Sequence, residues 1–221
     1  MIVETINKIK NEIGQDVKLV AVSKTKPASD IELAYAGGQR IFGENKVQEL
    51  VEKYEVLPKD IEWHLIGHLQ RNKVKYIAPF VSLIHAVDSK RLLKEINKQA
   101  LKCERTINVL LQFHIAQEES KFGFSFEEAK ELLEDNEFVE MQNVNIVGVM
   151  GMATNTENKE KVADEFRTLH NYFQIIKSHY FKFNPDFKEI SMGMSGDYNI
   201  ALEEGSTMIR VGSTIFGARN Y

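Results

Sequence analysis

Short apolar runs alternate with amphipathic segments along almost the whole chain. Each run is too short for a helix that crosses a core and has the length of a buried strand. We predict eight strands, over Lys18–Ser23, Arg40–Phe42, Glu62–Ile66, Val81–Ala86, Asn108–His114, Asn145–Met150, Phe187–Ser191 and Thr207–Val211.

The segments before and between these runs have the spacing of helices. Ile2, Ile6, Ile9 and Ile13 repeat at helical intervals and predict a first helix. Further helices are predicted over Asp30–Ala36, Lys46–Lys53, Asn72–Ile77, Lys90–Leu101, Phe126–Leu133, Glu157–Lys177 and Tyr198–Glu203. Gly37-Gly38 and Pro79 are typical helix stops after two of them.

Strands that alternate with helices imply right-handed crossovers and a parallel sheet. Eight such units that close on themselves make a (β/α)8 barrel, which needs at least about 200 residues. An open doubly wound sheet is the alternative, but no Gly-x-Gly-x-x-Gly sequence follows the first strand. Because no linker-like stretch interrupts the pattern, we predict one α/β barrel domain over residues 1–221.

Charge and cysteine content narrow the classes of function. The 28 Lys and Arg residues against 32 Asp and Glu residues give a net charge of −4, which provides no basic field for nucleic acid. Cys103 is the only cysteine, so an intramolecular disulfide is excluded and a reducing compartment is indicated. The sequence has neither a signal-peptide pattern nor a segment of transmembrane length, so we expect a cytoplasmic protein without a membrane partner.

One lysine stands at the C-terminal end of the first predicted strand. The alternation that turns Val20 and Val22 toward the barrel interior also aims Lys24 into its mouth. Desolvation there lowers the pKa of an ammonium group and favours the free amine that forms an imine with an aldehyde. A solvated lysine that opens a loop is the alternative interpretation.

Two segments rich in glycine and hydroxyl groups follow the last two predicted strands. They are Gly193-Met194-Ser195-Gly196 and Gly212-Ser213-Thr214. Barrel proteins often bind phosphate groups after strands seven and eight, where exposed backbone N–H groups and hydroxyls act as donors. The pair of segments therefore predicts a phosphate cradle, although either alone is typical of a turn.

Arg210 shares the inward face of the last strand with Gly212. A buried arginine needs an acceptor, either a carboxylate in a structural ion pair or the ring nitrogen of a bound heterocycle. An imine-forming lysine, a phosphate cradle and this arginine together describe a site for pyridoxal 5′-phosphate.

Several longer motifs resemble the pyridoxal phosphate homeostasis protein family. They are Val20–Pro27, Phe42–Glu49, Trp63–Lys73, Ser191–Asp197 and Gly205–Gly217, and they span nearly the whole chain. The resemblance implies an alanine-racemase-like barrel that holds the cofactor as an internal aldimine on Lys24. It also implies a role in vitamin B6 balance without established catalytic turnover.

The same resemblance implies roles for individual residues. The residues assigned to the phosphate are Ser195, Gly212 and Ser213, with Met194 and Thr214 beside them. Asn45 and His64 are assigned to the ring or its approach. Lys26 and Lys121 are assigned to cofactor transfer at the mouth of the barrel. Cofactor-dependent apoenzymes are the implied recipients, and a monomer or weak homodimer is expected.

We expect little or no racemase or transaminase turnover. Related racemases use a second base on a separate domain, whereas this chain ends at Tyr221, so Lys24 would serve one face of a substrate carbanion. His64 and Tyr198 are the candidates for the other face.

The open alternatives are a racemase-like enzyme acting on small amino acids and an aldolase in which Lys24 binds a phosphorylated sugar. No metal site is predicted, because His64 and His68 do not share a helix.

Overall fold

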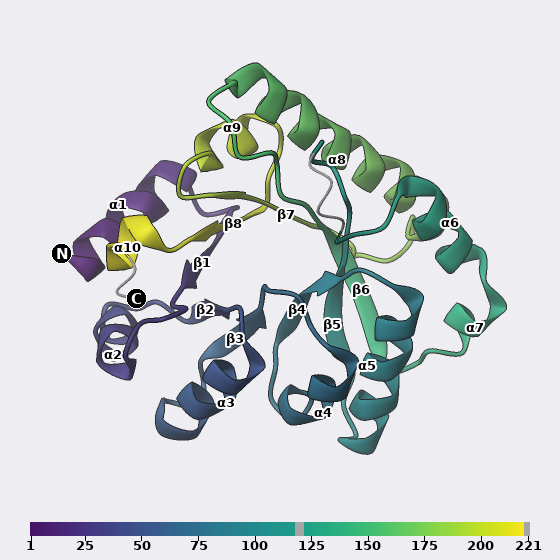
Figure 1. Cartoon of the computed structure of the whole chain (residues 1–221), viewed down its shortest axis with the longest axis horizontal. Coiled ribbons are helices and arrows are strands. Elements are labelled where there is room, and N and C mark those ends of the chain that lie inside the picture. Colours follow the sequence, from purple (N-terminus) through teal and green to yellow (C-terminus); the bar gives the residue numbers. More distant parts are fainter. Residues whose placement is uncertain (118–121, 219–221) are drawn as a thin grey trace.

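Eight parallel strands form a closed barrel in the computed structural model, which describes residues 1–117 and 122–218. The strands follow chain order around the barrel, and β8 pairs with β1 to close it (Figure 1). Their bounds are β1 Lys18–Val22, β2 Ile41–Glu44, β3 Glu62–Leu65, β4 Leu83–Val87, β5 Ile107–Gln112, β6 Val144–Met150, β7 Glu189–Met194 and β8 Met208–Val211. The predicted (β/α)8 barrel is confirmed, with strand ends displaced by a few residues.

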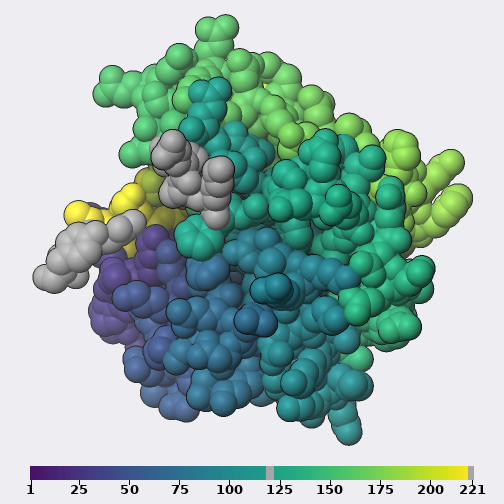
Figure 2. All heavy atoms as spheres, turned by 45° about the vertical axis from the view of Figure 1, so that its right-hand side comes forward, coloured from purple at the N-terminus to yellow at the C-terminus, as the bar shows by residue number. Residues whose placement is uncertain are grey.

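Helices surround the barrel on its outer side (Figure 1). Their bounds are α1 Ile2–Ile13, α2 Ala28–Ala36, α3 Val47–Val56, α4 Val74–Ile77, α5 Lys90–Lys102, α6 Phe126–Glu134, α7 Asn136–Val139, α8 Lys159–Tyr180, α9 Tyr198–Glu203 and α10 Ser213–Phe216. Figure 2 shows the teal-to-green part of the chain, which carries α5 to α7, closely packed on the face turned forward. None of the helices in the described part of the chain is long and apolar enough to cross a membrane.

Two short helices were not predicted from the sequence. The helices α7 and α10 have four residues each, which is little more than one turn and leaves no apolar period to detect. The helix predicted over Asn72–Ile77 begins instead as a 3₁₀ turn at Arg71–Lys73 and continues as α4.

Local sequence signals fix the start of several longer helices. Ser89 accepts a hydrogen bond from the Leu92 N–H at the start of α5. Ser125 and Glu128 form a capping box at the start of α6, in which each side chain bonds the backbone N–H of the other. Such caps satisfy N–H groups that have no partner within the helix, each contributing about 1 kcal/mol.

The buried apolar side chains form two layers on opposite sides of the sheet. Val20 packs inside the barrel, whereas Leu19 and Ala21 pack against the helices outside it. The inner layer contains Val20, Leu83, Ala86, Leu110, Val147, Met150 and Met208. This alternation confirms the inward face predicted for the first strand and directs the residues that follow it toward the barrel mouth.

Candidate functional site

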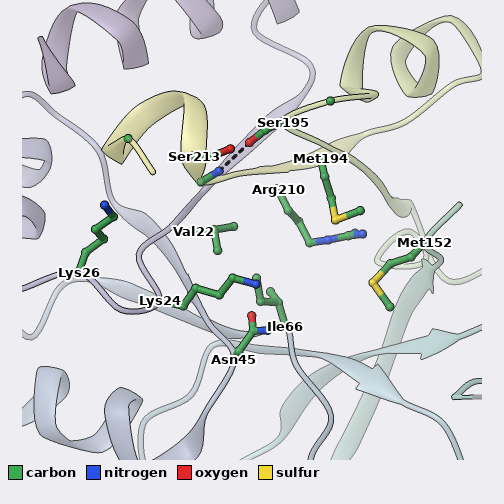
Figure 3. A pocket seen from close by; sticks show the side chains of 13 residues that line it. Val22, Lys24, Lys26, Asn45, Ile66, Met152, Met194, Ser195, Arg210 and Ser213 are labelled. Carbon is green, nitrogen blue, oxygen red and sulfur yellow. Dashed lines mark hydrogen bonds between the residues drawn. The ribbon is translucent and has the colours of Figure 1, made fainter. Parts of the chain in front are cut away.

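A pocket of about 250 Å³ opens at the C-terminal ends of the strands, where barrels gather functional side chains. Its walls come from segments that follow β1, β2, β3 and β6 and from the ends of β7 and β8 (Figure 3). The lining residues are Val22, Lys24, Lys26, Asn45, Ile66, Met152, Met194, Ser195, Gly196, Arg210, Gly212, Ser213 and Gly217. Segments from both ends of the sequence therefore meet at one site.

Lys24 and Asn45 approach each other on one side of this pocket (Figure 3). Lys24 follows β1 and is half-buried, and Asn45 follows β2. The backbone after β3 passes close to Asn45, because a Cβ on Gly67 would lie 2.5 Å from the Asn45 carbonyl oxygen. A side chain at Gly67 would therefore displace Asn45 from its place beside Lys24.

A buried ionic network lies behind Lys24. Lys53 Nζ donates to Glu44 Oε1 at 2.7 Å, to Glu49 Oε1 at 2.7 Å and to the Ser23 carbonyl at 2.8 Å. Ser23 Oγ donates to Glu44 at 2.6 Å, and the Thr25 N–H donates to Glu49 at 2.6 Å. Because Ser23 and Thr25 flank Lys24, the network fixes the backbone on both sides of that lysine.

Glu44 is fully buried and its second oxygen, Oε2, has no hydrogen-bond partner. Burial raises the pKa of the Glu44 carboxyl from its ordinary value of 4.5 to about 7, against the opposing effect of Lys53. A folded protein that holds this proton more tightly than the unfolded chain loses stability as pH rises through this range. The contribution is fully present below about pH 4.5 and is lost as pH rises through about 7.

Replacing Glu44 with glutamine is expected to remove this pH dependence. At about 1.4 kcal/mol per pH unit, the wild-type protein should lose up to about 3 kcal/mol relative to Glu44→Gln between about pH 4.5 and about pH 7. Urea unfolding of both proteins across this range measures the difference. A difference that stays constant with pH would show that Glu44 does not titrate there.

The opposite wall is formed by the two glycine-rich segments. The Gly212 N–H donates to Ser195 Oγ at 3.2 Å and so joins the end of β8 to the segment after β7 (Figure 3). The N–H group of Ser213 stands in the first turn of α10, where helix geometry provides no partner within the helix. This wall offers backbone and hydroxyl donors that suit an anionic oxygen group.

Arg210 lies between these two walls and is 4% exposed. Its Nη1 donates to Ser191 Oγ at 2.6 Å and its Nη2 to the Gly151 carbonyl at 3.1 Å. Both acceptors are neutral, so no structural ion pair holds Arg210 among the described residues. Burial lowers the pKa of Arg210 to about 10, with Asp197 acting in the opposite direction. The guanidinium stays cationic near neutral pH and contributes to the pocket wall.

Eight of the eleven residues predicted for the site lie in this pocket. They are Lys24, Lys26, Asn45, Met194, Ser195, Arg210, Gly212 and Ser213. Lys26 Nζ also donates to the Ala218 carbonyl at 2.8 Å, which ties the loop after β1 to the segment after α10. Lys121 lies outside the described residues.

The structure does not bring His64 or Thr214 to the pocket. His64 is on the inward face of β3, two residues before the pocket residue Ile66. It therefore lies about 6.6 Å deeper in the barrel than Ile66. It lines a second pocket of about 300 Å³ at the N-terminal ends of the strands, called the lower pocket below. Thr214 is exposed on α10, one residue beyond the lining Ser213. Tyr198, considered as a second base, donates instead to Glu12 on α1 at 3.0 Å.

Sequence reasoning missed two features of the site. Met152 lines the pocket opposite Lys24, and its signal is its place just after β6, whose C-terminal end faces the mouth. The network of Glu44, Lys53 and Glu49 was also missed. Its sequence signal is a glutamate that ends a buried strand, followed by Glu49 and Lys53 four residues apart on one helix face.

Comparison with known proteins gives matches over nearly the full chain. The alanine racemase N-terminal domain family matches residues 2–220. A pyridoxal phosphate homeostasis protein of Aquifex aeolicus (strain VF5) is 40% identical over 100% of this chain and 96% of its own length. PipY of Synechococcus elongatus PCC7942, in a structure with PLP bound, is 33% identical with a TM-score of 0.88, covering 98% of this chain and 100% of its own.

Alanine racemases share the fold at much lower sequence identity. The enzyme from Bartonella henselae, solved with covalently bound pyridoxal phosphate, is 15% identical with a TM-score of 0.74. The match covers 99% of this chain and 61% of the racemase. At this identity the likeness concerns the barrel alone.

Proposed function

Because the chain belongs to the pyridoxal phosphate homeostasis protein family, we propose that its pocket binds pyridoxal 5′-phosphate through Lys24. The bound cofactor serves intracellular pyridoxal phosphate homeostasis, including delivery to apoenzymes that depend on it. The observation that carries the proposal is the convergence of one lysine amine, one buried guanidinium and a wall of backbone and hydroxyl donors on a single pocket.

The donor set of this pocket suits the cofactor at both of its ends. When bound, pyridoxal phosphate supplies an aldehyde that condenses with a primary amine and releases water. Lys24 provides the amine, and the Ser195 and Gly212-Ser213 wall provides donors for the phosphate across the pocket. Asn45 is placed to contact the ring beside Lys24.

Arg210 is the residue proposed to face the ring nitrogen. A guanidinium only donates hydrogen bonds and does not readily give up a proton, so a ring nitrogen held beside it would stay unprotonated. An unprotonated ring is a weaker acceptor of electrons from a substrate carbanion. Arg210 therefore limits delocalisation of a carbanion into the ring but does not by itself distinguish a carrier from an enzyme.

Besides Lys24, the described walls offer two titratable side chains, and each of them donates to a backbone carbonyl. Lys24, Lys26 and Arg210 are the only titratable side chains that the structure places around the pocket within residues 1–117 and 122–218. Proton exchange on both faces of a substrate carbanion requires a group on each face. We therefore propose a carrier with little racemase or transaminase turnover.

Borohydride reduction tests the proposal directly. After incubation with pyridoxal phosphate, reduction and proteolysis, a pyridoxyl group is expected on the peptide that contains Lys24, with little on Lys26. Protein reduced without cofactor is the control. A label mainly on another lysine, or no visible absorption band before reduction, would contradict the proposal. Steady conversion of L- or D-amino acids by the loaded protein would instead support an enzyme.

A further inference from the structure

A chain of buried polar side chains runs through the barrel from the cofactor pocket to the lower pocket. It begins at Arg210, whose Nη1 donates to Ser191 Oγ at 2.6 Å. Ser191 Oγ lies 3.0 Å from His85 Nδ1, and His85 Nε2 lies 3.0 Å from His64 Nδ1. His64 then lines the lower pocket, near the Lys18–Glu189 ion pair.

All four side chains are more than nine-tenths buried. Ser191 and His85 are 0% exposed, His64 is 3% exposed and Arg210 is 4% exposed. Polar groups in such surroundings are costly unless each donor has an acceptor. The order of donors and acceptors along the chain is therefore constrained.

The cation at one end gives the chain a direction. Arg210 can only donate, so Ser191 Oγ accepts from it and retains its own hydrogen. His85 Nδ1 is the acceptor within reach of that hydrogen, which leaves the His85 proton on Nε2 for donation to His64 Nδ1. His64 then carries its proton on Nε2, at the lower pocket.

The reverse order leaves a hydrogen unused. If both imidazoles donated toward Arg210, Ser191 Oγ would accept twice and its own hydrogen would have no acceptor among the described residues. Both rings must also be neutral for either order. Burial holds the pKa of His64 at about 3, and burial with the neighbouring His64 and Arg210 lowers the pKa of His85 well below its ordinary value.

We propose that Ser191, His85 and His64 form a directed hydrogen-bond relay that positions the Arg210 guanidinium at the cofactor pocket. The relay fixes the acceptor of Arg210, since each hydrogen bond along it polarises the next. These three are positioning residues, and their effect on the cofactor rests on the proposed function. The direction of the relay is a property of the protein without cofactor.

The tautomers of the two histidines provide the first test. In cofactor-free protein with ¹⁵N-labelled histidine, long-range ¹H–¹⁵N spectra should show His64 and His85 as neutral Nε2–H tautomers from about pH 5 to about pH 8. The His64→Asn and His85→Gln variants assign the signals. An Nδ1–H tautomer or a protonated ring at either position would overturn the relay, whether or not the protein binds pyridoxal phosphate.

The positioning role is tested at Ser191 with a matched control. Ser191→Ala should weaken pyridoxal phosphate binding about tenfold or more, because Arg210 loses a buried acceptor, and Ser191→Thr should restore it. Ser206 is a buried serine two residues before β8 whose hydroxyl bonds the Met192 carbonyl and not Arg210. Equal effects of Ser191→Ala and Ser206→Ala on binding would overturn the role.

A variant at the far end tests transmission along the chain. His64→Leu removes the acceptor of His85, whereas the amide oxygen of His64→Asn stands near the place of Nδ1. We expect the His85 signals and cofactor affinity to change in His64→Leu and to recover in His64→Asn. Identical behaviour of the two variants would overturn transmission through His85. Failure of the wild-type protein to bind cofactor would refute the proposed function and leave the tautomer test standing.

Discussion

Replacing Lys24 with methionine is expected to abolish the visible absorption band that the protein forms with pyridoxal phosphate. The remaining contacts at Ser195, Gly212 and Arg210 would bind the cofactor without a covalent bond. We expect affinity to fall by about a hundredfold, equivalent to about 2.8 kcal/mol. Spectrophotometric titration of cofactor-free protein measures both changes.

Two further variants test whether the band depends on the Lys24 amine rather than on positive charge or on the neighbouring Lys26. Lys24→Arg keeps a cation but has no amine that condenses with an aldehyde, so it should also lack the band. Lys26→Met should keep the band, because Lys26 Nζ bonds the Ala218 carbonyl. An unchanged spectrum in Lys24→Met would assign the covalent bond to another lysine.

Replacing Lys53 with methionine is expected to lower the free energy of unfolding by about 3–5 kcal/mol near neutral pH. The substitution leaves Glu44 buried with Ser23 Oγ as its remaining partner, and it releases Glu49 and the Ser23 carbonyl. The loss should be smaller at acidic pH, where Glu44 takes up a proton. Urea unfolding at several pH values measures it.

The surface lysine Lys90 provides the matched control. Lys90 also contacts two carboxylates, Asp135 at 2.5 Å and Glu137 at 2.6 Å, but is 35% exposed. Lys90→Met should therefore cost much less stability than Lys53→Met. The double variant Lys53→Met/Glu44→Gln should recover part of the lost stability, because it removes the uncompensated charge. A similar cost for Lys53→Met and Lys90→Met would contradict the buried network.

The barrel and much of its mouth could be predicted because they follow from local patterns. Apolar runs identify strands, and alternation within β1 turns Val20 inward and carries Lys24 to the mouth. The turns at Ser195 and Gly212 are predicted by their glycine and serine content. Their position after the last two strands predicts that they bind a phosphate group.

The depth of a residue inside the barrel could not be predicted in this way. The alternation of side chains along β3 predicts that His64 points inward. The stagger between neighbouring strands determines whether such a side chain reaches the cofactor pocket or the lower pocket. The pairing of Lys53 with Glu44 joins a helix face to the end of a strand, and period alone does not specify such a contact. The sequence pattern therefore predicted the inward orientation of such residues better than their contacts.

The closure of the barrel by β1 and β8 also determines when the site can form. Lys24 follows the first strand to leave the ribosome, whereas Gly212 and Ser213 follow the last. A nascent chain therefore exposes the lysine long before the opposite wall of the pocket exists. We therefore expect pyridoxal phosphate to bind only after synthesis of the whole barrel. Because a ligand that binds only the folded form stabilises that form by mass action, the bound cofactor should then oppose unfolding of the barrel.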